Sequence, residues 1–197
     1  MTHNILLRKV NCKDLADLST LHLKSLPDDY LSLLGRNFLQ NIYYPNLLES
    51  SNVALVSIAN NKITGFIFFN DNDSFFKDLV INNCLIILKY ALHKCTNLSF
   101  IRYSFIVLML LLFSPKQFQG AELCYMAVSI DYRKVGIGEQ LVKQGLFKLH
   151  ELGVKNVWVK TLKSTNETIK FYKTLGFDIV CERFDRVFLQ RSTNIHT

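Results

Sequence analysis

Gly136 and Gly138 stand one residue apart in the stretch "DYRKVGIGEQLV", directly behind Arg133 and Lys134. Glycine lets the backbone approach another object closely, and two glycines so near each other leave several amide N–H groups uncovered by side chains. Between residues 131 and 175, nine Lys or Arg residues against four Asp or Glu residues contribute +5 of the formal net charge of +7. These features predict a site for a small anionic group.

The residues around the two glycines narrow the kind of anion. A P-loop needs GxxxxGK followed by Ser or Thr, which is absent, and a dinucleotide fingerprint would need glycine where Leu141 stands. The segment "ELCYMAVSI" is expected to be a strand, and a helix is expected to run from the glycines to Leu152. Amides from Val135 to Glu139 would then point outward at the positive end of the helix dipole, which suits a pyrophosphate. A plain strand-to-helix turn, with glycines for tightness, is the alternative.

Two motifs together point to a family. The segment "AVSIDYRKVGIG", followed further along by "NETIKFYKTLGF", resembles the GNAT superfamily of acyl-CoA-dependent N-acetyltransferases. The resemblance covers residues 121–190 as the acetyl-CoA-binding core. It implies an α/β (α+β) GNAT fold in one domain, residues 1–197, with a central mixed, mostly antiparallel sheet and helices on both faces. Residues 75–113 are expected to form a helical insertion before the cofactor-binding strand.

The resemblance also implies a binding site for acetyl-CoA, as acyl-donor cosubstrate, and no metal. Loop residues would bind the coenzyme A pyrophosphate, strand residues would pair with the pantetheine arm, and Asn166 would contact the arm from the other side. The loop residues are Arg133, Lys134, Val135, Gly136, Ile137, Gly138 and Glu139, and the strand residues are Met126, Ala127 and Val128. Tyr172 matches the tyrosine whose hydroxyl lies beside the thioester sulfur.

The chemistry of acetyl transfer assigns two catalytic candidates. An amine attacks a thioester only as the free base, donors must meet the oxyanion, and an acid helps the thiolate to leave. Tyr172, with an ordinary pKa of about 10, suits the last role, and an N–H near Val128 suits the oxyanion. Glu122 matches the general base of the histone acetyltransferase branch. Water could replace Glu122 as the base, and Tyr172 could be a core residue.

Other elements must position these residues. Strands are expected over 5–10, 53–59, 63–69, 154–162, 177–182 and 186–191, with a tight hairpin at Asn60 and Asn61. A helix capped by Asn11 is expected to run to Leu26. A second is expected from Tyr30 to Tyr43, ended by Pro45, and Ser164 to Glu167 reads as a capping box. One face of the helix after the glycines would hold Leu141, Val142, Gly145, Leu146, Leu149 and Leu152.

Composition limits the partners and the compartment. The apolar run Phe105–Phe113 has nine residues, well short of the roughly 20 that span a bilayer, so no membrane partner is expected. No zinc-finger pattern or arginine–aromatic interleaving favours nucleic acid. The five cysteines are scattered, and no signal peptide is apparent, which favours the cytoplasm. A homodimer would be usual for the family.

The acceptor is the least specified partner. In this fold the first helices line its site, and here "SLPDDYLSLLGRNFLQNIYY" and the insertion resemble bacterial GNAT proteins of surface-polysaccharide and amino-sugar pathways. The expected function is therefore acetyl transfer to a primary amine of a small molecule, preferably a nucleotide-linked amino sugar, by direct attack in a ternary complex. The alternatives are a protein lysine or N-terminal acetyltransferase and a non-catalytic acyl-CoA-binding module.

Overall fold

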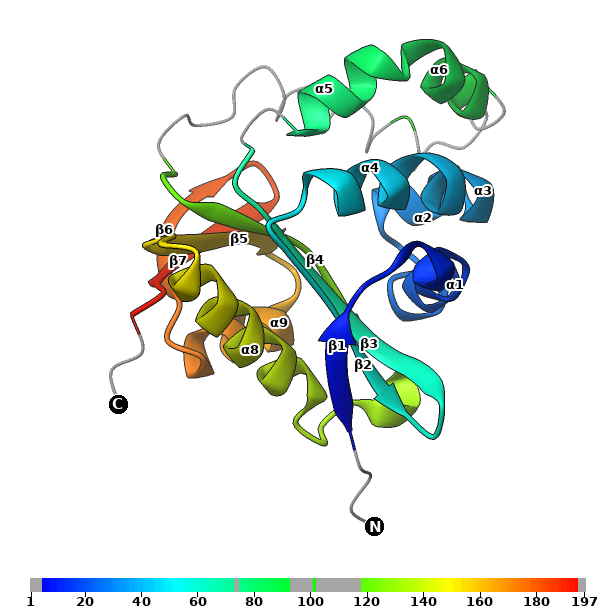
Figure 1. Cartoon of the computed structure of the whole chain (residues 1–197). Helices are drawn as coiled ribbons and strands as arrows, with labels where there is room; N and C mark the ends of the chain where they lie inside the picture. Colours follow the sequence, from blue (N-terminus) through cyan, green and yellow to red (C-terminus); the bar gives the residue numbers. More distant parts are fainter. Residues whose placement is uncertain (1–4, 73–74, 93–100, 102–117, 195–197) are drawn as a thin grey trace.

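One twisted sheet organises the computed structural model, which describes residues 5–72, 75–92, 101 and 118–194 (Figure 1). The strand order is β1-β2-β3-β4-β5-β7-β6, and every neighbouring pair is antiparallel except β4 and β5. The strands are β1 Leu6–Lys9, β2 Val53–Ala59, β3 Lys62–Asn70, β4 Ala121–Val128, β5 Asn156–Leu162, β6 Asp178–Arg183 and β7 Arg186–Ser192. The predicted fold class, a mixed and mostly antiparallel sheet with helices, is confirmed.

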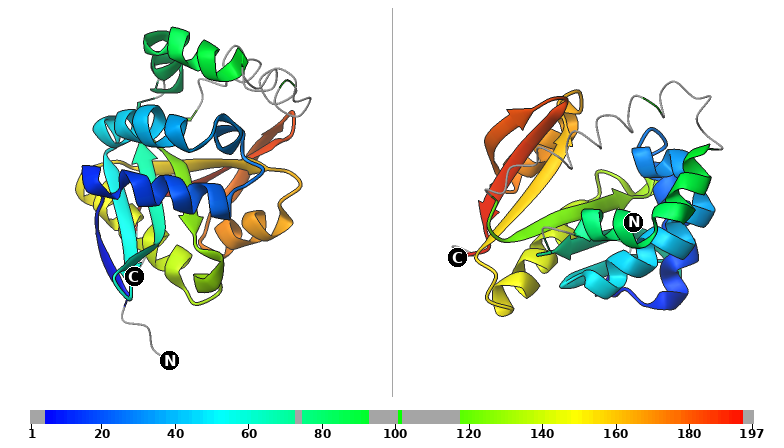
Figure 2. Two further views of the ribbon diagram at one scale, coloured as in Figure 1. Left: turned by 90° about the vertical axis from the view of Figure 1, so that its right-hand side faces the viewer. Right: turned by 90° about the horizontal axis from the view of Figure 1, so that it is seen from above.

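Helices cover both faces of this sheet (Figure 2). α8 and α9 pack on one face, and the helices that follow β1 pack on the other. The bounds are α1 Leu15–Ser25, α2 Tyr30–Leu34, α3 Arg36–Phe38, a π-helical turn Leu39–Tyr43, α4 Tyr44–Ser50, α5 Phe75–Asn82, α6 Cys84–Leu92, α8 Ile137–Glu151 and α9 Asn166–Thr174, with 3-10 turns at Cys12–Asp14 and Ile130–Tyr132. No helix in the described ranges is both long and apolar enough to cross a membrane.

Two apolar cores hold the layers together. The core under α8 includes Leu141, Val142, Leu146 and Leu149, each at most 2% exposed. Within it, Gly145 lies so close to the ring of Phe69 that a Cβ at position 145 would overlap the ring. The absence of a side chain at Gly145 therefore sets how tightly α8 lies on the sheet. Aromatic residues dominate the opposite core, among them Phe38, Tyr43, Tyr44, Phe66 and Phe68.

Several predicted elements are confirmed for the predicted reasons. Asn60 and Asn61 adopt φ values of 51° and 58°, which is the conformation that a two-residue hairpin between β2 and β3 requires. Asn11 caps the turn before α1 and shares a reciprocal capping box with Asp14. Gly153 and Gly176 follow α8 and α9 with φ of 77° and 78°, so both end their helices as expected.

The helix predicted from Tyr30 to Tyr43 is wrong in its bounds. Gly35, with φ of 90°, ends α2, and the chain then stays helical through the π-helical turn to Ser50. Pro45 lies in the first turn of α4, directly after the π-helical turn. Pro45 therefore does not end the helical run.

Two smaller predictions are also wrong. Thr165, not Ser164, precedes α9, and its hydroxyl donates to the Leu162 carbonyl oxygen at 2.7 Å instead of capping the helix. Leu152 is 61% exposed, because it follows the last turn of α8 and is not part of the buried face. In the insertion, α5 and α6 are divided at Asn83, whereas the predicted break near Thr96 and the apolar run 105–113 lie outside the described residues.

Candidate active site

The glycine loop forms an open cradle at the start of α8. Lys134 and Gly136 both have positive φ, 63° and 87°. The amides of residues 134–139 donate no hydrogen bond to the described chain, and the first helical bond is donated by Gln140 to the Gly136 carbonyl oxygen at 3.0 Å. Successive free amides at the positive end of a helix form a binding site for an anion such as pyrophosphate.

The two glycines serve different purposes. Nothing lies within 4 Å of a Cβ built on Gly136, so glycine is favoured there by its left-handed backbone conformation. A Cβ on Gly138 would lie 3.3 Å from Phe171 Cζ and 3.8 Å from Val128 Cγ2. Gly138 therefore allows the start of α8 to lie against α9 and the end of β4.

The Arg133 guanidinium binds backbone carbonyl oxygens of this chain rather than pointing freely into the glycine loop. Its Nε donates to the Val128 carbonyl oxygen at 3.2 Å, and its Nη2 donates to the Ser25 carbonyl oxygen at 2.9 Å. The guanidinium thus ties the end of β4 to the C-terminus of α1. Lys134, the other predicted basic residue, is exposed.

β4 and β5 separate soon after they meet. Their parallel pairing covers only Ala121 with Val157 and Glu122 with Trp158, whereas β3 pairs with β4 as far as Val128. The Ser129 amide donates to Thr64 of β3 at 2.8 Å. Because successive residues of a strand turn their amides to opposite edges, the amides of Val128 and Met126 point into the splay between β4 and β5. An extended chain could pair with this free edge.

Tyr172 lies in the core beneath the loop. It is 4% exposed, and the rings of Phe171 and Phe177 meet it edge-on at 5.3 and 5.4 Å between centroids. Burial raises the pKa of Tyr172 well above its ordinary value, so the phenol stays protonated. Its hydroxyl has no hydrogen-bond partner among the described residues, and Asn166, the first residue of α9, is exposed.

Glu122 forms an ion pair with Lys160, a residue that the sequence analysis did not identify. Lys160 of β5 places its Nζ 2.7 Å from Glu122 Oε1, and the two side chains are 40% and 21% exposed, respectively. The Lys160 ammonium also lies 5.8 Å from the centroid of the Trp158 ring. Trp158 itself packs against Phe118, Phe188 and Cys181.

A bulge in β4 gathers further polar groups on the face of Glu122. The register with β3 shifts so that Cys124 has no partner, and both Cys124 and Tyr125 face the core opposite α8. The Tyr125 hydroxyl donates to Asp29 Oδ2 at 3.0 Å, and the Leu31 amide donates to the same oxygen at 3.0 Å. The bulge thus brings the carboxylate after α1 to the centre of the sheet.

Asp29 joins a second buried residue to this group. His22, fully buried on α1, has its Nε2 3.4 Å from Asp29 Oδ2 and its Nδ1 2.7 Å from the Tyr44 hydroxyl. Burial raises the pKa of Asp29, but His22 and the hydrogen bonds from Leu31 and Tyr125 outweigh burial, so the pKa is lowered. The carboxylate is therefore ionised at neutral pH.

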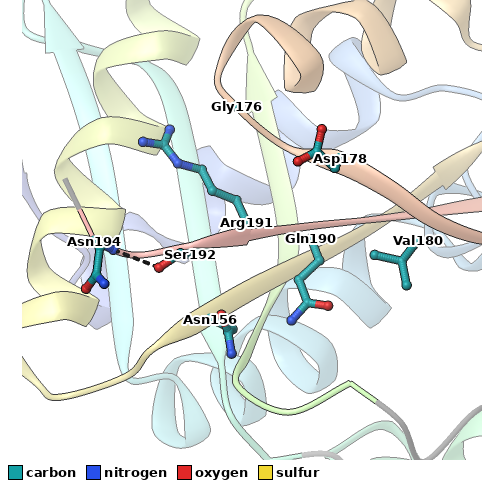
Figure 3. Close-up of a pocket in the computed structure, with 8 residues that line it drawn as sticks. All are labelled: Asn156, Gly176, Asp178, Val180, Gln190, Arg191, Ser192 and Asn194. Atoms are coloured by element: carbon teal, nitrogen blue, oxygen red, sulfur yellow. Dashed lines mark hydrogen bonds between the residues drawn. The ribbon is translucent and has the colours of Figure 1, made fainter. Parts of the chain in front are cut away.

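A pocket of about 560 Å³ lies away from these residues, at the far end of β7 (Figure 3). It includes none of the predicted site residues. Its lining consists of Asn156, Gly176, Asp178, Val180, Gln190, Arg191, Ser192 and Asn194. In the described part of the chain, no three His, Cys, Asp or Glu side chains converge in a way that could hold a metal ion.

Known proteins share this architecture. The model of the acetyltransferase (GNAT) family matches residues 15–177, whereas no curated protein matches the sequence. The ribosomal-protein-S18-alanine N-acetyltransferase from Escherichia coli is 14% identical, with a TM-score of 0.63 over 98% of this chain and 96% of that chain. The PaiA N-acetyltransferase from Thermoplasma acidophilum, in complex with coenzyme A, is 13% identical, with a TM-score of 0.62 over 96% of this chain and 99% of that chain.

These likenesses in structure, at such low identity, show the fold, and the family model shows the family. The family model spans α1 to α4, the β2–β3 hairpin, β4, the glycine loop and α9 in one continuous match. The splay of β4 from β5 and the open start of α8 lie within that match. The chain therefore belongs to the GNAT family of acetyltransferases.

Proposed function

We propose that this acetyltransferase transfers the acetyl group of acetyl-CoA to the primary amine of a small molecule, preferably a nucleotide-linked amino sugar, by direct attack in a ternary complex. The observation that carries the proposal is the parting of β4 from β5 beside the open start of α8. The free edge of β4 suits an extended pantetheine arm, and the amides of residues 134–139 suit the pyrophosphate.

The residues beside the gap between β4 and β5 have separate roles in binding acetyl-CoA and in catalysis. Bound acetyl-CoA supplies an activated thioester. The Val128 amide, which points into the splay, donates to the thioester oxygen as charge develops there. Met126 and Ala127 continue the strand edge along the arm, and Asn166 contacts the arm from α9. The Tyr172 hydroxyl donates a hydrogen bond to the sulfur. Because its pKa is raised, Tyr172 stabilises the departing thiolate as a donor rather than as a strong acid.

Glu122, on the face of β4 opposite α8, deprotonates the acceptor amine. Its Oε1 accepts from Lys160, whereas no described residue donates to its second carboxylate oxygen. We assign to that oxygen the removal of a proton from the incoming ammonium, directly or through one water molecule. Glu122 and Asp29 place two carboxylates on this face of the sheet, and these suit a cationic acceptor despite the net charge of +7.

Acetylation of a protein N-terminus or lysine is the second candidate. It is supported by the name of one structural neighbour, a ribosomal-protein-S18-alanine N-acetyltransferase. A peptide acceptor would require a groove that holds extended backbone, and it would show a sequence preference around the acetylated amine.

One assay separates these functions. Release of coenzyme A from acetyl-CoA is followed with amino sugars, their nucleotide conjugates, polyamines and peptides. The proposal predicts the highest kcat/KM with an amino sugar or its conjugate. A higher value with peptides would establish the second candidate. Tight binding of acetyl-CoA with no release for any amine would identify a non-catalytic acyl-CoA-binding module.

A further inference from the structure

Arg186, the first residue of β7, carries a guanidinium without a matched partner. Its side chain is 17% exposed, and its buried Nε makes no hydrogen bond. The neighbouring Asp185 offers Oδ1 at 3.5 Å, but this oxygen is also buried without a hydrogen bond. In the described ranges no other residue forms an ion pair with Arg186. Burying the Nε–H of a guanidinium without a hydrogen-bond acceptor costs free energy, so the arrangement suits a ligand that supplies the acceptor.

The side chain of Arg186 lies on the face of the sheet opposite α8, which is the face of Tyr125 and Glu122. Val187 and Leu189 belong to the core under α8, whereas Phe188 packs on the opposite face. Because side chains alternate along a strand, Arg186 shares the face of Phe188 and hence that of Tyr125. Arg186 pairs with Leu162 of β5, beyond the point where β4 and β5 part.

Arg186 and Tyr125 also interact electrostatically. Burial and Asp29 raise the pKa of Tyr125, and the positive charge of Arg186 opposes that rise. The hydroxyl of Tyr125, on β4, donates to Asp29. This face of the sheet thus carries the carboxylates of Asp29 and Glu122, the latter paired with Lys160, and the guanidinium of Arg186 beside Asp185.

We infer that Arg186 binds an anionic group, a carboxylate or a phosphate, on the same acceptor molecule whose amine is acetylated. This inference rests on the proposed function and specifies its acceptor. The planar guanidinium presents parallel N–H donors that match two oxygens of either group. The ammonium of such an acceptor would face Asp29 and Glu122, so that the two ends of the molecule fix the direction in which the amine approaches the thioester.

Calorimetry on the full chain saturated with coenzyme A tests this assignment. Two matched pairs of amines are titrated: glucosamine with glucosamine 6-phosphate, and alaninamide with alanine. The parent protein is expected to bind the anionic member of at least one pair more tightly, and that pair identifies phosphate or carboxylate. Arg186→Gln is expected to weaken binding of the anionic member on the order of 10- to 100-fold and to leave the neutral member unchanged. Arg186→Lys should restore part of the preference.

Lys163→Gln is the matched control, because it removes one positive charge beside the same hairpin from a lysine that pairs with Glu182 at 3.0 Å. It should keep the parent's preference. Equal binding of charged and neutral members by the parent, or an unchanged preference in folded Arg186→Gln, would overturn the inference. Coenzyme A release on the same samples separates the two proposals: acetylation without charge preference refutes only the role of Arg186, and charge-selective binding without acetylation of any amine refutes the proposed function.

Discussion

Glu122 and Lys160 form an ion pair with 2.7 Å between Oε1 and Nζ, at the place where β4 and β5 part. The last paired residues of the two strands are Glu122 and Trp158, and Lys160 follows Trp158 on the same face of β5. Pairs this exposed contribute little to stability. The importance of this pair therefore lies in its position, since it holds a carboxylate at the base of the splay.

Replacing Glu122 by Gln should lower turnover while the protein stays folded. The amide keeps the shape of the side chain but cannot take a proton, so kcat should fall on the order of 100-fold, the low end of general base catalysis. The loss should be greatest at low pH, where more of the acceptor is protonated. The measurement is kcat against pH for parent and variant, and identical profiles would assign deprotonation to water.

Lys160→Met provides the comparison for Glu122→Gln. It removes the cation beside Glu122 but keeps the carboxylate, so the KM of a cationic acceptor should fall rather than rise. A fall in kcat as large as that of Glu122→Gln would instead give Lys160 a direct part in the reaction.

Tyr172→Phe should separate chemistry from packing. Since no described residue bonds to the hydroxyl, its removal should change thermal stability and acetyl-CoA affinity little, while kcat drops on the order of 100-fold. The raised pKa also predicts that kcat does not decline through deprotonation of Tyr172 as pH approaches the ordinary tyrosine value of about 10. Full activity combined with lowered stability would show that Tyr172 is only a core residue.

Local patterns predicted most of the elements, because hydrophobic period, turn residues and glycines act over short distances. The Asn60–Asn61 hairpin and the start of α8 are examples. The helix from Tyr30 was misjudged because Pro45 fits the first turn of a helix as well as the end of one. The Glu122–Lys160 pair and the Tyr125–Asp29 bond join residues far apart in the sequence, and the second depends on a bulge at Cys124. No local pattern carries such information.

Asp29 should make the free energy of unfolding decrease as the pH falls into the acidic range. Its pKa is lowered in the folded protein, so its contribution is present above the ordinary carboxyl pKa of about 4 and is lost as pH falls towards the folded value. Asp29→Asn should cost about 1 to 3 kcal/mol at pH 7, because Tyr125 and the Leu31 amide lose a charged acceptor. When the pH is lowered from about 5 to about 3, the melting temperature of the Asp29→Asn variant should fall less than that of the parent protein.

The control for this prediction is Asp178→Asn, the same chemical change at an exposed position on β6. It should melt like the parent at both pH values. A parallel acid dependence in the parent and Asp29→Asn would mean that other carboxyl groups set the acid transition.

Acetyl-CoA binding by a pair of glycine variants tests the account most directly. Gly136 and Gly153 have φ of 87° and 77°, have nothing within 4 Å of a built Cβ, and flank opposite ends of α8. Aspartate should strain the backbone similarly at both positions, but only Gly136→Asp puts a negative charge among the free amides. Calorimetry should therefore find acetyl-CoA binding abolished in Gly136→Asp and retained in Gly153→Asp. Parental affinity in a folded Gly136→Asp protein would contradict the assignment of the coenzyme to this loop.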